Sequence, residues 1–88
     1  MSKTVTMTIE NTSGITAQMA QRIVQVASEF ESDITLCYLK KEVDLKSILG
    51  IMSLAVLEGA RVDIEAKGID AEAAIKAIRE TIAKGGIK

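Results

Sequence analysis

The fold is decided by RVDIEAKGIDAEAAIKAIRETIAKG, residues 61–85, where the period of the apolar side chains changes once. Residues 61–67 alternate between charged and apolar side chains, which predicts a strand with one buried face. From residue 71 the apolar side chains follow a helical period. The residues on this helical stripe are Ala71, Ala74, Ile75, Ile78 and Ile82. We expect Asp70 to cap the start of this helix and Gly85 to end it.

The same change of period recurs along the chain and predicts seven elements, in the order β-α-β-β-α-β-α. Strands are expected at residues 4–9, 34–38, 43–45 and 61–67, and helices at 17–30, 48–54 and 71–82. Every strand has one polar face, which favours an antiparallel sheet covered by helices on its other face. The predicted fold is therefore α+β, an open-faced β-sandwich with a four-stranded antiparallel sheet and three helices on one face.

The composition predicts one small domain, residues 1–88, with 48% apolar residues and a net charge of −1. That charge argues against direct nucleic-acid binding, which normally needs a basic stripe. A single cysteine, Cys37, excludes an internal disulfide and fits a reducing, cytoplasmic location. No apolar run approaches the roughly 20 residues of a membrane span, and the first residues show no apolar signal core. We expect no metal site and no cofactor.

Two junctions between a loop and a helix carry the functional signal. They are SGITAQMA, residues 13–20, and LKSILGIMSL, residues 45–54. The first resembles the active-site segment of HPr, the histidine-containing phosphocarrier of the bacterial sugar phosphotransferase system, which reads Gly-Ile-His-Ala-Arg-Pro-Ala. The second resembles, almost residue for residue, the regulatory serine segment of that family, Lys-Ser-Ile-Met-Gly-(Val/Leu)-Met-Ser-Leu. The resemblance extends over the whole chain.

The first junction departs from the family pattern at three positions. The resemblance places Thr16 at the phosphorylated histidine, Gln18 at the arginine and Met19 at the proline, and the chain contains no histidine. A threonine hydroxyl is not ionised at neutral pH without an adjacent base, and Gln18 supplies no positive charge. We therefore expect Thr16 to be a helix N-cap, and phosphocarrier activity there to be absent. The N–H groups of Ala17 and Gln18 leave open a residual anion site.

The second junction keeps the family's serine at Ser47, which we also expect to cap a helix. The resemblance implies that the family's HPr kinase/phosphorylase modifies Ser47, and that the phosphorylated form binds a LacI-type catabolite-control regulator. A phosphate here would meet free N–H groups and the positive end of the helix dipole. The helix is too short to bury all its apolar residues, so a partner-binding patch is expected. Its candidates are Met19, Ile48, Leu49, Ile51 and Met52.

The leading hypothesis is a non-enzymatic regulatory member of the family that lacks the phosphocarrier histidine and acts through Ser47. One alternative is a phosphocarrier by ancestry, which the missing histidine contradicts chemically. Another is a scaffold that binds the sugar-system enzymes non-productively through Met19, Ile48 and Met52. A generic small-molecule-binding module is a further alternative. The chain is expected to be a monomer or a homodimer, since the threonines of residues 4–9 form a face that could pair with a second copy.

Overall fold

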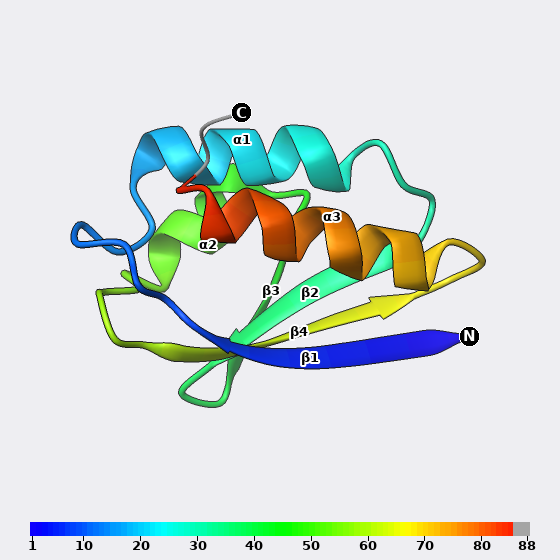
Figure 1. Ribbon diagram of the computed structural model, residues 1–88, viewed down its shortest axis with the longest axis horizontal. Helices are drawn as coiled ribbons and strands as arrows, with labels where there is room; N and C mark the ends of the chain where they lie inside the picture. The colour runs from blue at the N-terminus through cyan, green and yellow to red at the C-terminus, as the bar shows by residue number, and fades with distance from the viewer. Residues whose placement is uncertain (86–88) are drawn as a thin grey trace.

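The computed structural model describes residues 1–85 and contains one sheet and three helices (Figure 1). The sheet is antiparallel with the strand order β1-β4-β2-β3. The strands are β1 (Ser2–Thr8), β2 (Asp33–Tyr38), β3 (Lys41–Asp44) and β4 (Arg61–Lys67). The helices are α1 (Ala17–Ala27), α2 (Ile48–Ser53) and α3 (Ala71–Ala83), and all three cover the same face of the sheet. The predicted α+β open-faced sandwich is confirmed.

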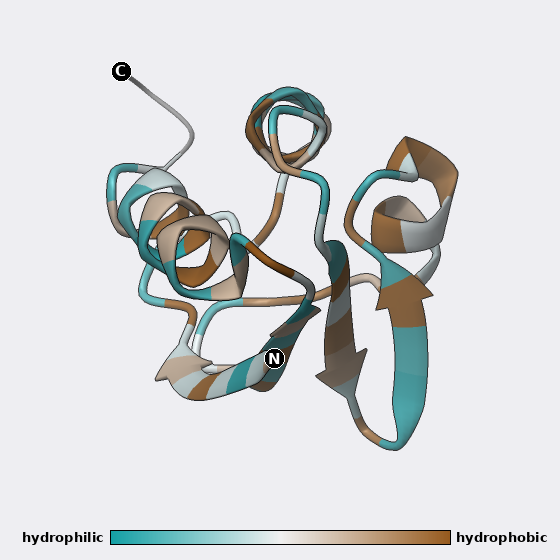
Figure 2. Ribbon diagram, turned by 90° about the vertical axis from the view of Figure 1, so that its right-hand side faces the viewer, coloured by the Kyte–Doolittle hydropathy of each residue, from teal (hydrophilic) through white to brown (hydrophobic). Residues whose placement is uncertain are grey.

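The core lies between this face of the sheet and the three helices. Ile64 of β4 pairs with Val5 of β1 and with Leu36 of β2, so the register places apolar side chains beside one another across the sheet. Ile64 and Leu36 are fully buried, and so is Ile23 of α1. Teal and brown bands alternate along the strands at the lower left of Figure 2, as expected for strands with one face toward solvent.

Several ends of elements differ from the predicted ones. α1 stops at Ala27, not at residue 30, because the next turn tightens into bonds that span three residues. In that turn, Glu29 N–H donates to Val26 O at 3.1 Å and Phe30 N–H to Ala27 O at 3.2 Å. α2 ends one residue early, with Leu54 as its C-cap. The second strand of the hairpin is Lys41–Asp44 and not residues 43–45. These shifts leave the order of elements unchanged.

Asp70 precedes α3, as predicted, but it does not cap the helix with its side chain. Its carboxylate accepts hydrogen bonds from the N–H groups of Glu31 and Ser32, both at 2.9 Å, and from the Ser32 hydroxyl. The Ser32 hydroxyl, followed by the Glu31 N–H, lowers the pKa of Asp70. Asp70 is therefore the N-cap residue, as predicted, through its carbonyl oxygen, which accepts from Ala74 N–H at 2.9 Å. Its side chain does not cap the helix, because both carboxylate oxygens are occupied by the loop between α1 and β2.

Candidate functional site

Thr16 is the N-cap of α1, as predicted. Its backbone is extended, and its Oγ1 accepts a hydrogen bond from Met19 N–H at 3.1 Å. Its carbonyl oxygen accepts from Ala20 N–H at 2.8 Å, which is the first bond of the helix. Lys84 is the one ionisable residue among the described side chains that line the shallow hollow at Thr16. No carboxylate or imidazole in this lining could take the proton of the Thr16 hydroxyl.

The loop before Thr16 is bonded to the segment that follows α2. Ile15 N–H donates to the carbonyl oxygen of Val56 at 3.0 Å. Gly14 has a φ of +65°, and a Cβ at this position would lie 2.2 Å from the same oxygen. Only glycine permits this approach, because any side chain would collide with the Val56 carbonyl. The loop of the first junction is therefore joined to the segment that directly follows the second junction.

Ser47 is the N-cap of α2, as predicted. Its Oγ accepts from Gly50 N–H at 3.1 Å, and its carbonyl oxygen accepts from Ile51 N–H at 3.1 Å. The neighbouring Lys46 directs its Nζ to the carbonyl oxygen of Phe30, 2.9 Å away, after the end of α1. Ser47 is half-buried. Ser47 thus begins a helix that is anchored to the segment after α1 through the side chain of Lys46.

Three apolar side chains of α2 are exposed, and we call them the α2 patch: Ile48, Leu49 and Met52. Leu49 has 81% of its surface exposed, and the other two have slightly more than a third. Ile51 is only 1% exposed, because it lies on the side of α2 that packs into the core. Met19 is also 1% exposed, because it lies on the buried side of α1. The prediction that Met19 and Ile51 lie on the exposed surface is therefore corrected.

Leu57 was missed by the sequence analysis. Its side chain is 67% exposed, and its Cα lies beside Gly14. A Cβ added to Gly14 would lie 2.8 Å from the Cα of Leu57. Leu57 lies outside any segment with an apolar period, so the sequence gives no reason to expect it to be buried. This missing period was the available clue that Leu57 is exposed. Leu57 adds an exposed apolar side chain next to the Thr16 loop.

Within residues 1–85, no group of three metal-ligating side chains is close enough to hold a metal ion. No helix in this described part is long and apolar enough to cross a membrane. Gln18 is exposed on α1, and it gives the turn a neutral amide where a cation would be needed to hold a phosphoryl group. The chemistry available at the site is therefore that of two hydroxyl groups at helix starts, together with the apolar side chains beside them.

The molecule is an open-faced sandwich whose first two helices each begin at a hydroxyl cap. The family model described as the PTS HPr component phosphorylation site matches residues 3–84. HPr-C-His from Thermoanaerobacter tengcongensis is 44% identical with a TM-score of 0.90, and the match covers 96% of this chain and 94% of that one. The chain belongs to the HPr family and is related to its phosphocarrier proteins.

Two further solved structures show the range of similar relatives. The histidine-containing phosphocarrier protein of a Mycoplasma is 33% identical with a TM-score of 0.90, covering 98% of this chain and 99% of its own. Crh of Bacillus subtilis, described as a catabolite repression protein, is also 33% identical. Its TM-score is 0.76, with 93% and 94% coverage, and it is a dimer with swapped domains. The neighbours thus include both a phosphocarrier and a catabolite repression protein.

Proposed function

We propose that this chain is a non-enzymatic regulator of the sugar phosphotransferase and carbon catabolite repression system, similar in role to Crh. In this proposal Thr16 occupies the family's phosphohistidine position and carries no phosphoryl group. Ser47 is the phosphorylated residue, and the phosphorylated protein acts by binding partners. The observation that carries the proposal is the Thr16 hydroxyl, which caps α1 in a chain that has no histidine.

The chemistry at Thr16 opposes phosphoryl transfer. A carrier needs a nucleophile that is free at neutral pH and forms a labile adduct, and imidazole meets both conditions. The Thr16 oxygen already accepts the Met19 N–H, and the described residues around it offer no general base. Gln18 cannot stabilise the transferring group as a guanidinium would.

The geometry at Ser47 is compatible with a phosphate. Phosphorylation would add a charge of about −1.5 to −2 at neutral pH and three acceptor oxygens. One of those oxygens can take over the Gly50 N–H that the hydroxyl now accepts at 3.1 Å. The charge would also lie at the positive end of the helix. The HPr kinase/phosphorylase is the proposed modifying enzyme.

The α2 patch is the proposed partner surface, joined by Leu57 and without Met19 and Ile51. Exposed apolar side chains next to a modifiable serine allow one contact area to be switched by charge. The proposed partner of the phosphorylated form is a LacI-type catabolite-control regulator. Non-productive binding of the sugar-system enzymes by the unmodified form is the second candidate, favoured by a patch that is already exposed without modification.

The test is incubation of the full chain with an HPr kinase/phosphorylase and ATP, followed by intact-mass measurement and site mapping. We expect one phosphate, located on Ser47. Ser47→Ala should abolish the modification, and Ser53→Ala serves as the matched control on the same helix. Transfer of label from phosphoenolpyruvate to the unmodified protein, giving an acid-labile adduct, would contradict the proposal. Equal regulator binding with and without phosphate would favour the scaffold role.

A further inference from the structure

The two edges of the sheet are built differently. β3 has four residues, of which three are charged: Lys41, Glu42 and Asp44. Short and charged edge strands resist pairing with another chain. β1, at the opposite edge, has seven residues, no proline and one charged side chain, Lys3. β1 therefore lacks the features that usually protect an edge.

The free edge of β1 presents backbone groups at every second residue. Gly68 N–H donates to Met1 O, and Ile9 N–H donates to Ala60 O, both at 2.8 Å. Residues bonded to the partner strand alternate in an antiparallel pair, so the odd-numbered residues of β1 bond to β4. The N–H and C=O groups that point away from the sheet therefore belong to Ser2, Thr4, Thr6 and Thr8.

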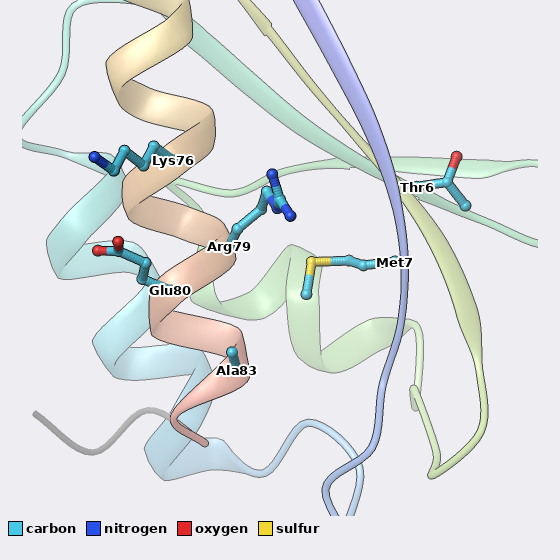
Figure 3. Close-up of a pocket in the computed structure, with 6 residues that line it drawn as sticks. All are labelled: Thr6, Met7, Lys76, Arg79, Glu80 and Ala83. Atoms are coloured by element: carbon cyan, nitrogen blue, oxygen red, sulfur yellow. The ribbon is translucent and has the colours of Figure 1, made fainter.

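A hollow lies beside this edge, between β1 and α3 (Figure 3). Met7 and Arg79 point into the gap between the strand and the helix, and Lys76 and Glu80 line the hollow from the far side of α3. Met7 is half-buried, so part of its side chain is accessible in the gap. Arg79 is exposed and makes no ion pair within residues 1–85. The hollow thus combines apolar surface with an available guanidinium.

We propose that the outer edge of β1 binds an extended, acidic segment of a partner protein as a fifth strand of the sheet. The outward backbone groups of β1 would supply the main-chain hydrogen bonds. Side chains of the added strand alternate between the two faces of the sheet. Those facing α3 would lie near Met7 and Arg79, where a carboxylate pairs with the guanidinium. This site is separate from Ser47 and does not depend on its phosphorylation.

A second copy of this chain is a poorer occupant on grounds of charge. Arg79 lines one hollow with Lys3 and another with Met7, so it lies alongside the middle of β1. If two β1 strands paired antiparallel about Val5, their Arg79 side chains would approach one another. Like charges brought together at an interface disfavour that pairing. An acidic segment has no such penalty.

The test uses the full chain labelled with 15N and a capped peptide of alternating valine and threonine with one central glutamate. A matched peptide carries lysine in place of the glutamate. We expect amide shifts concentrated in residues 2–8 and tighter binding of the glutamate peptide. Arg79→Ala should weaken that binding about fivefold, as expected for an exposed ion pair, and remove the preference for glutamate. Lys41→Ala is the control, with the same loss of charge on β3 at the opposite edge of the sheet, and should change the affinity less than about twofold.

A second variant tests the strand pairing itself. Thr6→Pro removes an outward N–H without removing a bond to β4, so it should abolish peptide binding. Should this variant fail to fold, the comparison of Arg79→Ala with Lys41→Ala decides the question. Equal affinity for the two peptides would overturn the proposal, and so would shifts in β3 instead of β1. Shifts in β1 that follow protein concentration without peptide would also overturn it and identify a second copy as the occupant.

Discussion

The two ends of the molecule use their helix starts in opposite ways. At one end, Thr16 accepts a hydrogen bond from an N–H three residues further along, and Ser47, at the start of α2, does the same. At the other end, where α3 begins, Asp70 accepts from the N–H groups of Glu31 and Ser32, which are 39 and 38 residues away in the chain (Figure 1). A local cap can be altered without loosening the rest of the fold, whereas the Asp70 bonds hold two loops together. We therefore expect modification to be tolerated at the hydroxyl caps and not at Asp70.

The largest effect should come from Gly14→Ala, which would break the link between the loop before α1 and the segment after α2. The added Cβ would lie 2.2 Å from Val56 O, at a φ of +65°. Clash and backbone strain together should lower the free energy of unfolding by at least about 3 kcal/mol. Gly59→Ala is the control, because its φ is +87° and nothing lies within 4 Å. That variant should lose only about 1 kcal/mol in urea unfolding, and equal losses would show that strain alone acts at Gly14.

Asp70→Asn tests the other end and should have the second-largest effect. An amide has one acceptor oxygen, so it cannot accept from both the Glu31 and the Ser32 N–H as the carboxylate does. We expect a loss of thermal stability greater than that of either hydroxyl-cap variant. Hydrogen exchange should show faster opening of the loop before β2. A variant as stable as the wild type would mean that the two ends do not differ.

The carboxylate also gives the Asp70 end an acid dependence that hydroxyl caps lack. The Ser32 hydroxyl and the Glu31 N–H lower the pKa of Asp70 below its ordinary value of 3.8. A lowered pKa in the folded state stabilises the protein above the unfolded pKa, and this stabilisation is lost as the pH falls through the folded pKa. Urea unfolding from neutral into acid pH should show this loss in the wild type and a smaller loss in Asp70→Asn. Parallel profiles would contradict the assignment.

Thr16→Ala and Ser47→Ala should each lower the free energy of unfolding by about 1 kcal/mol, because each removes one N-cap. The caps lie in separate helices, so the double variant should show nearly additive losses. If the two variants lose the same free energy of unfolding, a difference in their phosphorylation cannot come from a difference in stability. Only Ser47→Ala should abolish phosphorylation by the kinase, and Thr16→Ala should be modified as the wild type is.

The smallest effect on stability should be that of phosphorylation at Ser47. The helix dipole and the free N–H groups offset the new charge, so the free energy of unfolding should change by no more than about 1 kcal/mol. Ser47→Asp should retain the cap but imitate the phosphate poorly in regulator binding, since a carboxylate carries less charge and fewer acceptor oxygens. Melting curves of the modified and unmodified protein measure the first expectation. A much larger change in the free energy of unfolding would indicate that Ser47 takes part in a tertiary contact.

The sequence was sufficient for the fold and for the two hydroxyl caps because both depend on local patterns. The change of period separates strands from helices, and a hydroxyl before an apolar helix predicts a bond three residues on. Asp70 shows where this reasoning ends, since its oxygens are taken by a loop that is near only after folding. The predictions that Met19 and Ile51 are exposed were wrong for a related reason. The period of a short segment does not fix which of its apolar residues the rest of the fold covers.

The pairing of β1 with β4 has a consequence for synthesis on the ribosome. Thr4 pairs with Glu65, and β4 lies between β1 and β2 in the sheet. Until β4 has left the exit tunnel, the hairpin of β2 and β3 has no third strand, and the first strand has no partner at all. Contacts so distant in the chain form late in folding, and unpaired strands are then open to association. The nascent chain is therefore most vulnerable to misassembly just before its last strand and helix emerge.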